Sequence, residues 1–468
     1  MPVKLFDSQA HELVEFTPLV PGHVSVYVCG PTVQSSPHVG HLRSALVYDL
    51  WARWLEYRGF QVTVVRNVTD IDDKILEASS GSAEQWWALA ERVEAEFQDA
   101  ADALGISRPT KQPRATGDIP SMLELISTLM SSGHAYSAKD GSGDVYFDVS
   151  QWSDYGELTH QKVEDLRSSS GHGLMEAGAK RNPEDFALWK GHKASEPDTA
   201  SWSAPWGAGR PGWHLECTAM ATRYLGSSFD IHGGGMDLRF PHHENELAQA
   251  RAAGDGYANH WLHNALVTVQ GNKMSKSLGN GVLAAEMLAH ARPLVIRYAL
   301  ASAHYRSELD LHEGFLAEAG TAFGRIESFL ARAETQGITT AGGEIPEAFA
   351  QAMDDDLGIP AALAVLHDTV RQGNHAADES ASDAFATAAQ QVRAMLSVLG
   401  LDPLDPRWGK DPGSDDVLEA LVENILALRG KAKSEKDFAL SDALRAALDR
   451  SGIDVQDEPT TSTWSIRG

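Results

Sequence analysis

The chain has 468 residues, of which 43% are hydrophobic, and it carries a formal net charge of −26 at pH 7. This length suggests about three domains, and the hydrophobic fraction is typical of a globular protein with sizeable buried cores. No run of about 18 apolar residues occurs, which argues against a membrane span. The acidic balance opposes nucleic-acid binding over the surface as a whole, so an RNA partner requires a local basic surface.

The N-terminal residues lack the charged-then-apolar layout of a secretory signal. The only two cysteines, Cys29 and Cys217, lie in separate motifs, and such a pair does not indicate a disulfide framework. We therefore expect a cytoplasmic protein with no membrane segment.

The first 70 residues predict a βαβ unit. Residues 24–28 alternate with period two and predict a strand, which a turn at 29–32 follows. From His41 to about Arg58, apolar residues recur every fourth position and predict an amphipathic helix. Residues 62–68 predict a second strand. This order indicates a doubly wound α/β fold with a parallel sheet.

The predicted secondary structure changes at two further points of the chain. Residues of about 110–200 mix helical stretches, a strand pattern and turns, and helical patterns dominate from about residue 285. A break rich in Pro and Gly precedes the last segment. We predict a Rossmann-like domain in two halves (1–110 and 200–285), a connective insertion (111–199), a helical linker (286–345), a helical bundle (346–401) and a small C-terminal module (402–468).

The turn between the first strand and the first helix holds the sequence His38-Val39-Gly40-His41. Ligands of doubly wound sheets bind at this edge, where helix N-termini offer unpaired N–H groups. Two imidazoles there can donate hydrogen bonds to triphosphate oxygens, and Gly40 lets a nucleotide approach the backbone. The alternative is that two histidines cap the helix by chance.

A second motif, Lys273-Met274-Ser275-Lys276-Ser277, lies on a loop flanked by glycines. Flexible lysines on such a loop suit a mobile clamp that neutralises the charge of a leaving pyrophosphate. An ordinary solvated loop is the alternative, and the upstream histidine motif makes it less probable.

Both cysteines lie near histidine, carboxylate and glycine. Two thiolates with an imidazole and a carboxylate are sufficient for a tetrahedral zinc site. His242 and Glu246 are four residues apart, so on a helix they face the same way. Thiolates favour zinc over magnesium or calcium, and the sequence lacks the His-Glu-x-x-His pattern of a hydrolytic zinc helix. The alternative is that each of these residues is an ordinary core or surface residue.

Together these motifs resemble the class I aminoacyl-tRNA synthetases, whose two defining short motifs match residues 38–41 and 273–277. Within that class the chain is most similar to the cysteinyl-tRNA synthetase family. The stretches that carry this resemblance extend over nearly the whole chain and are 27–32, 67–74, 211–217, 229–246 and 463–464. One departure is 34–36, where many relatives carry Tyr-Asp-Tyr and this chain has Gln-Ser-Ser.

The resemblance implies ATP-dependent activation of L-cysteine and its transfer to tRNA(Cys), with one Zn²⁺ per chain and Mg²⁺ accompanying ATP. It implies zinc ligands at Cys29, Cys217, His242 and Glu246. The implied catalytic residues are His38, His41, Lys273 and Lys276. The ATP-binding residues are the two histidines, Gly40, Gly234 and Lys276, and those of the amino-acid pocket are Gly30, Thr69 and Trp213.

The resemblance also implies that the substrate thiolate joins the zinc. Serine differs from cysteine only by oxygen for sulfur, and pockets discriminate such small groups by only about 10–200-fold. Zinc prefers a thiolate strongly, so the site needs no editing domain, and no segment resembles one. The triple glycine at 233–235, which follows the strand expected at 229–231, is expected to be a flexible stretch beside the adenosine.

The resemblance places an anticodon-binding helical bundle from about residue 346, and we expect a monomer. Basic residues of the C-terminal module could meet tRNA phosphates, and Trp464 could stack on an unpaired base or pack onto the bundle. The basic residues are Lys431, Lys433, Lys436 and Arg445.

Three alternative functions remain. The nearest is an ATP-dependent ligase that transfers cysteine to an amino sugar, as in mycothiol synthesis. Such ligases lack the full C-terminal tRNA module, and about 120 residues follow residue 346 in this chain. A non-catalytic zinc-stabilised RNA-binding protein would not need both phosphate motifs. A zinc hydrolase would need an open metal position and no ATP-binding loops.

Overall fold

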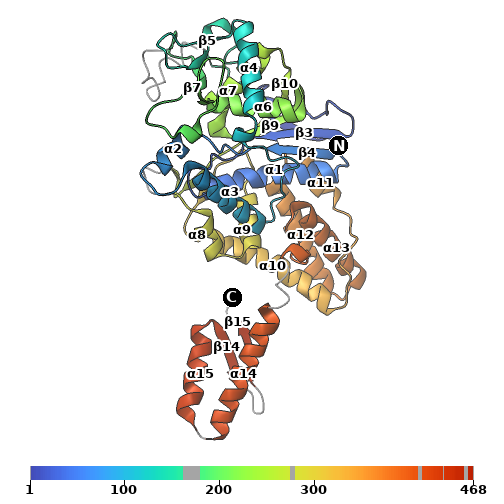
Figure 1. Ribbon diagram of the computed structural model, residues 1–468. Helices are drawn as coiled ribbons and strands as arrows, with labels where there is room; N and C mark the ends of the chain where they lie inside the picture. Colours follow the sequence, from blue (N-terminus) through green and yellow to red (C-terminus); the bar gives the residue numbers. More distant parts are fainter. Residues whose placement is uncertain are drawn as a thin grey trace. The chain divides into compact units, whose positions relative to one another are not determined.

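The computed structural model describes residues 2–161, 180–274, 280–408, 414–435, 437–457 and 462–466. The chain forms two compact units, 1–402 and 403–468. At the centre of the larger unit is a sheet of four parallel strands (Figure 1). Their order is β10 (Tyr257–Asn264), β9 (Ser228–Gly235), β3 (His23–Val28) and β4 (Gln61–Arg66).

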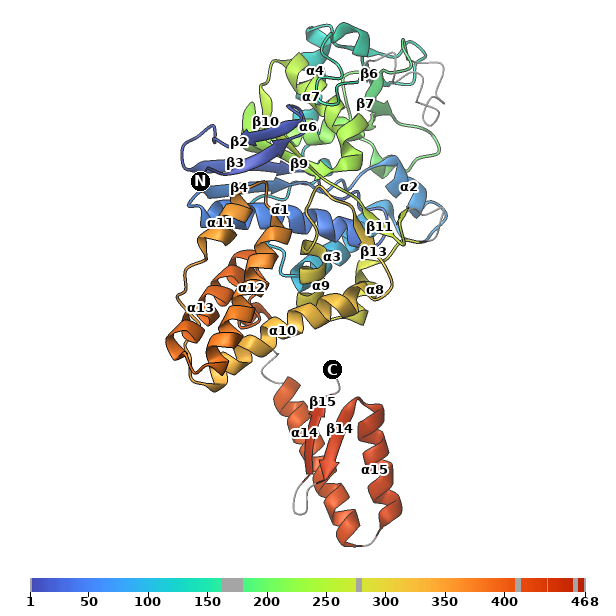
Figure 2. The same cartoon turned by 180° about the vertical axis from the view of Figure 1, so that it is seen from behind.

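Helices cover both faces of this sheet. Helix α1 (Val39–Tyr57) lies on one face, and α6 (Trp213–Leu225) and α7 (Glu244–Ala253) lie on the other (Figures 1 and 2). A sheet covered on both faces buries nearly continuous apolar runs, as in β3. The doubly wound α/β fold predicted from the sequence is confirmed.

The strand register brings the carboxyl ends of three strands to one level. Val28 of β3 pairs with Arg66 of β4 on one side and with Gly233 of β9 on the other. The next residue, Cys29, still donates its backbone N–H to the Gly233 carbonyl at 3.0 Å. Side chains that follow these strands therefore converge at one edge of the sheet, where doubly wound proteins bind ligands.

The three consecutive glycines belong to β9 itself, so the expectation of a flexible stretch after the strand was wrong. A Cβ atom on Gly233 would lie 2.2 Å from the Tyr48 ring of α1, and one on Gly234 would lie 2.8 Å from Cε1 of His243. The glycines therefore allow side chains on both faces to approach the strand backbone closely.

Between β4 and α6 the described residues form three α-helices and a second sheet. The helices are α2 (Asp73–Ser79), α3 (Trp86–Ala103) and α4 (Ile119–Ser131). The second sheet is antiparallel and consists of β5 (Ala135–Ser137), β6 (Val145–Phe147), β7 (Phe186–Gly191) and β8 (Gly209–Pro211). One cluster of buried apolar side chains includes Tyr27 of β3 and Phe147 of β6, so the two sheets share a core.

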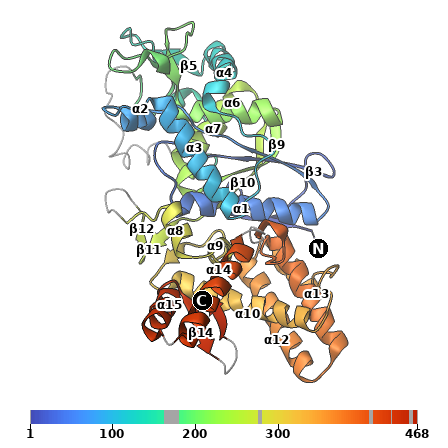
Figure 3. The same cartoon turned by 60° about the horizontal axis from the view of Figure 1, so that its bottom comes forward.

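A small sheet and a group of helices follow the central sheet. The small sheet contains β11 (Val267–Val269), β12 (Asn272–Lys273) and β13 (Leu309–Leu311). The helices are α8 (Ala284–His290), α9 (Pro293–Ala301), α10 (Phe315–Thr335), α11 (Glu347–Asp354), α12 (Ile359–Asp378) and α13 (Ser382–Leu399). Helices α9 and α13 pack against α1 (Figure 3). A hairpin of β1 (Lys4–Asp7) and β2 (Glu12–Glu15) packs against β10.

In the described residues of the smaller unit, the helices α14 (Ser414–Ser434) and α15 (Phe438–Arg450) are followed by a hairpin of β14 (Ile453–Asp457) and β15 (Ser462–Ile466). Its core consists of Val422, Leu448 and Ile453, and Trp464 packs against them half-buried. No helix in the described parts of the chain is long and apolar enough to cross a membrane.

Candidate active site

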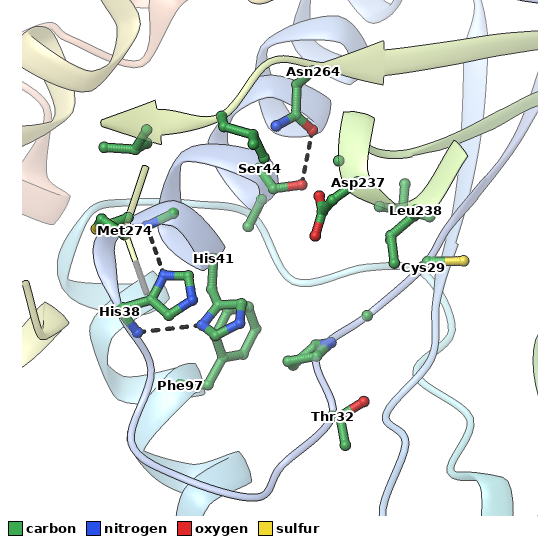
Figure 4. A pocket seen from close by; sticks show the side chains of 18 of the residues that line it. Cys29, Thr32, His38, His41, Ser44, Phe97, Asp237, Leu238, Asn264 and Met274 are labelled. Carbon is green, nitrogen blue, oxygen red and sulfur yellow. Dashed lines mark hydrogen bonds between the residues drawn. The ribbon is translucent and has the colours of Figure 1, made fainter. Parts of the chain in front are cut away.

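A cavity of about 340 Å³ lies at the carboxyl edge of the central sheet (Figure 4). Its walls come from the β3–α1 turn, the end of β9 and the β10–β11 connection. Seven residues singled out from the sequence line it: Cys29, Gly30, His38, Gly40, His41, Trp213 and Lys273. The structure therefore brings the histidine motif, the first lysine of the loop motif and one cysteine around a single space.

The two histidines of the first motif cap α1. The Nδ1 atom of His38 accepts a hydrogen bond from the Gly40 N–H at 3.1 Å, and Nδ1 of His41 accepts from the His38 N–H at 3.2 Å (Figure 4). The rings stack with centroids 3.7 Å apart. Because each neutral ring accepts at Nδ1, its proton is on Nε2, which makes Nε2 a donor. Two such donors at a helix N-terminus suit phosphate oxygens.

Gly40 is required by the cap itself. A Cβ atom at this position would lie 2.9 Å from Cε1 of His38. The glycine therefore lets the His38 ring fold back over the first turn of α1. The sequence reasoning assigned Gly40 only to the approach of a nucleotide.

The four residues expected to bind zinc lie together below the cavity. The Sγ atom of Cys29 is 3.6 Å from Sγ of Cys217 and 3.5 Å from Oε1 of Glu246, and Nε2 of His242 is 3.1 Å from the same oxygen. All four ligand atoms lie within 4.8 Å of one another. A tetrahedral zinc with Zn–S bonds of about 2.3 Å separates two sulfurs by about 3.8 Å, so the arrangement fits this metal.

Residues outside the predicted set orient these ligands. Oε2 of Glu246 binds Nε2 of His232 at 2.8 Å and the Tyr257 hydroxyl at 2.7 Å, so Oε1 is the oxygen that faces Cys29. Such outer partners fix the orientation of metal ligands. The sequence reasoning missed both residues, and the only signal was that His232 directly precedes the glycines.

The imidazole of His242 is oriented in the same way. Trp213 stacks on it with centroids 4.0 Å apart, and Nδ1 of His214 is 2.9 Å from its Nδ1. Its Nε2 therefore faces the cluster. Trp213 thus connects the four candidate ligands to the wall of the cavity.

The electrostatics of the cluster suit a cation. Burial raises the pKa of the Cys29 thiol well above its ordinary value and raises that of Cys217. Burial lowers the pKa of His242 to about 3, so its ring is neutral. Burial alone would raise the pKa of Glu246, but His232 and His242 outweigh it and lower that pKa. A dication would supply the positive charge that thiolates need here.

A second set of four ligands shares two members with the first. Cys29 and Glu246 also lie within 4.8 Å of His232 and His243. The set with two sulfurs is the softer one and therefore the better match to zinc.

Three other predicted residues have mainly supporting contacts. Gly30 leaves room for the Asn67 carbonyl, since a Cβ atom would lie 1.6 Å from that oxygen. Thr69 is buried and donates to Oε2 of Glu216 at 3.0 Å, and it does not line the cavity. Gly234 does not line the cavity either, whereas its neighbours Gly235 and Asp237 do.

The structure describes three of the five lysines that were singled out from the sequence. Lys273 lies in β12 at the cavity, whereas Lys276 and Lys436 lie outside the described residues. Lys431 and Lys433 are exposed in the last turn of α14. Arg445 is on α15, with its Nη2 3.5 Å from the Val455 carbonyl.

Comparisons with known proteins identify the family of this chain. Residues 15–321 match the family model of the tRNA synthetases class I (C) catalytic domain, and residues 348–403 match that of the DALR domain. The chain is 55% identical to a cysteine–tRNA ligase of Clavibacter sepedonicus and 56% identical to one of Leifsonia xyli subsp. xyli. Both alignments cover 100% of both chains.

A solved structure shows the same fold. Methionyl-tRNA synthetase of Mycobacterium tuberculosis in complex with methionyl-adenylate superposes with a TM-score of 0.58 at 16% sequence identity. The superposition covers 82% of this chain and 90% of the other. At this identity the likeness concerns the fold alone.

Proposed function

The chain belongs to the cysteine–tRNA ligase family of class I aminoacyl-tRNA synthetases, and from this premise we propose which of its residues charge tRNA(Cys) with cysteine. The protein is an ATP-dependent enzyme of this class. The observation that carries the assignment is the identity of 50–56% to cysteine–tRNA ligases over the full chain. The same comparisons do not favour transfer of cysteine to an amino sugar.

A metal fits the buried cluster, and we propose that it is Zn²⁺ held by Cys29, Cys217, His242 and Glu246. The distance between the sulfurs and the softness of the donors support this choice. When bound, zinc supplies a site that prefers a substrate thiolate to the hydroxyl of serine. In the chain itself, His232 and Tyr257 hold the carboxylate of Glu246 in place.

The cavity above the cluster suits the first step of the reaction. The carboxylate of cysteine attacks the α-phosphorus of ATP, an oxygen–phosphorus bond forms, and the bond to the leaving pyrophosphate breaks. His38 and His41 donate from Nε2 to phosphate oxygens, and Lys273 and Lys276 neutralise the leaving group. Mg²⁺ accompanies ATP and adds positive charge there. The residues act by positioning and charge stabilisation, and no side chain becomes a nucleophile.

The walls of the cavity place the amino acid beside these groups. Trp213 and Gly30 border the metal end. Thr69 supports this wall indirectly, because it accepts a hydrogen bond from Asn67, whose Oδ1 accepts one from the Gly30 N–H. Gly40 and Gly235 border the nucleotide, and Gly234, which lies off the cavity wall, supports Gly235 as its neighbour in β9. Charge neutralisation and substrate selection then take place in adjacent parts of one cavity.

In the second step a terminal ribose hydroxyl of tRNA takes the cysteinyl group and AMP leaves. We propose that the bundle of 346–401, which overlaps the DALR match, binds the anticodon arm. Lys431, Lys433, Lys436, Arg445 and Trp464 of the C-terminal module are proposed as further contacts. We also propose that the enzyme is a cytoplasmic monomer.

Two assays test the proposed function. The first is cysteine-dependent exchange of labelled pyrophosphate into ATP, with serine as the control substrate. The second is charging of purified tRNA with labelled cysteine, with a glucosaminyl-inositol acceptor in parallel. We expect exchange with cysteine only and product on tRNA only. Product on the amino sugar would contradict the function, and full exchange by Lys276→Ala would contradict the role of this lysine.

A further inference from the structure

Arg66, the last residue of β4, is a buried cation. Its side chain is 6% exposed, yet its guanidinium makes no hydrogen bond or ion pair to any residue in the described part of the chain. Two other buried arginines, Arg43 and Arg297, make several hydrogen bonds each. Arg43 donates to four backbone carbonyls, and Arg297 binds Asp49 and three carbonyls.

The side chain of Arg66 lies at the cavity that holds the histidine motif. Arg66, His41 and Phe97 all line this cavity. The guanidinium carbon of Arg66 lies 5.3 Å from the centroid of the Phe97 ring, which holds the planar group over an apolar face. Its Cγ would be 3.5 Å from a Cβ atom on Gly30, so Arg66 also borders the residue that supports the metal end.

The two carboxylates that most affect the charge of Arg66 already form ion pairs with other arginines. Asp49 binds Arg53 and Arg297, and Asp102 binds Arg108. Burial lowers the pKa of Arg66 to about 10, so the group is still protonated at pH 7. A buried charge is costly unless it is paired, and no carboxylate among the described residues forms a direct ion pair with Arg66. A bound anion can supply it.

We propose that Arg66 is a further substrate-binding residue that donates hydrogen bonds to a phosphate group in the cavity. Guanidinium forks match phosphate oxygens in two-point geometry. The proposal rests on the proposed function, because that function brings two sources of phosphate to this space. One is the triphosphate of ATP, and the other is the terminal phosphate of tRNA, the phosphodiester that joins its last nucleotide to the one before it.

The test compares Arg66→Met and Arg66→Lys with the full-length wild-type enzyme. Arg108→Met is the matched control, because it removes an arginine charge near the same strand at an exposed site. The KM for ATP is measured by pyrophosphate exchange, and the KM for tRNA by charging. The midpoint of thermal unfolding is measured with and without ATP.

We expect Arg66→Met to raise one of the two KM values at least 10-fold, with Arg66→Lys intermediate and Arg108→Met unchanged. A rise for ATP assigns the triphosphate, and a rise for tRNA alone assigns its terminal phosphate. We also expect the midpoint of the free Met variant to be equal to or above that of the wild type, since an unpaired buried charge has been removed.

A purely structural role predicts the opposite pattern. A lower midpoint for the free Met variant with unchanged KM values for both substrates would overturn the proposal, as would unchanged KM values alone. If the Met variant does not fold, Arg66→Lys decides by the same two KM values. Wild-type enzyme without cysteine-dependent exchange would instead refute the proposed function. In that case the rise in the unfolding midpoint on addition of ATP, compared between the wild type and Arg66→Met, would still show whether Arg66 binds phosphate.

Discussion

Arg297 of α9 donates a hydrogen bond to Asp49 of α1 across 2.6 Å, and both side chains are almost completely inaccessible to solvent. The same guanidinium donates to the carbonyls of Leu104 after α3 and Leu399 of α13. Gly400 leaves it room, since a Cβ atom there would lie 2.6 Å from Nη2 of Arg297. One side chain thus joins the helix that starts at the histidine motif to the bundle at 346–401.

Replacing this arginine should weaken the whole larger unit. We expect Arg297→Met to lower the free energy of unfolding by about 3 kcal/mol, because Asp49 keeps only Arg53 as a charged partner. Urea unfolding measures the change. Arg92→Met is the control, since its ion pairs with Glu84 and Glu96 are largely exposed, and it should cost less than about 1 kcal/mol. Equal losses in the two variants would contradict the role of Arg297.

Asp49 should also give the stability a specific dependence on pH. Burial alone would raise its pKa, but Arg297 and Arg53 outweigh burial and lower it to about 2. Between about pH 4 and pH 2 the unfolded chain binds a proton that the folded protein does not. The contribution of Asp49, about 2 kcal/mol, is therefore complete above pH 4 and is lost as the pH falls toward 2.

Urea unfolding at pH 5 and pH 3 tests this dependence. The wild-type enzyme should lose more stability over this interval than Asp49→Asn, whose side chain does not titrate. An identical loss in both proteins would exclude Asp49 as a source of the acid sensitivity.

Loss of either sulfur should remove the metal. We expect Cys29→Ser and Cys217→Ser to reduce the zinc content from one per chain to nearly none, because a hydroxyl is a poor ligand for this soft ion. Elemental analysis measures zinc, and pyrophosphate exchange with cysteine should fall with it. The control is His290→Ala, which removes an exposed imidazole outside the cluster and should keep the zinc. Retention of zinc by both serine variants would refute the ligand set.

Gly40→Ala should damage the nucleotide end while sparing the fold. The new Cβ atom would lie 2.9 Å from the His38 ring and displace it, so pyrophosphate exchange should fall at least 10-fold. Gly324→Ala in α10 is the control, because nothing lies within 4 Å of the added atom. It should stabilise the protein by about 0.5–1 kcal/mol with normal exchange. Normal exchange by the Gly40 variant would contradict the role of the cap.

Local patterns were sufficient to predict the first βαβ unit. The strand expected at 24–28 is β3, and the helix expected to end near Arg58 is α1, which ends at Tyr57. The prediction that Cys29 and Cys217 lie side by side rested on the motifs around each cysteine, because no pattern along the chain shows directly that two distant residues are in contact. The parallel sheet followed from the βαβ order alone, whereas the anticodon-binding role of the helical bundle rested on the resemblance to the family.

Other features had no local signal. His232 and Tyr257 are 25 residues apart in sequence, and only the pairing of β9 with β10 places both on one carboxylate. The glycines of β9 indicate a loop by composition, whereas contacts with Tyr48 and His243 make them part of a strand. Arg66 has no ion pair with Asp49 or Asp102 because these carboxylates bind other arginines. No pattern along the chain predicts those ion pairs.

The last three residues of β9 are glycines without side chains, and this constrains how the specificity of the enzyme can evolve. The Tyr48 hydroxyl accepts from the Gly234 N–H and donates to its carbonyl, while His243 approaches the same residue closely. A single layer of backbone thus separates Tyr48 from His243, and in the proposed function it is the partition between the side that binds ATP and the side that selects sulfur. A mutation that shifts this partition changes both specificities at once, so variants that accept a different amino acid should need compensating changes on the side that binds ATP.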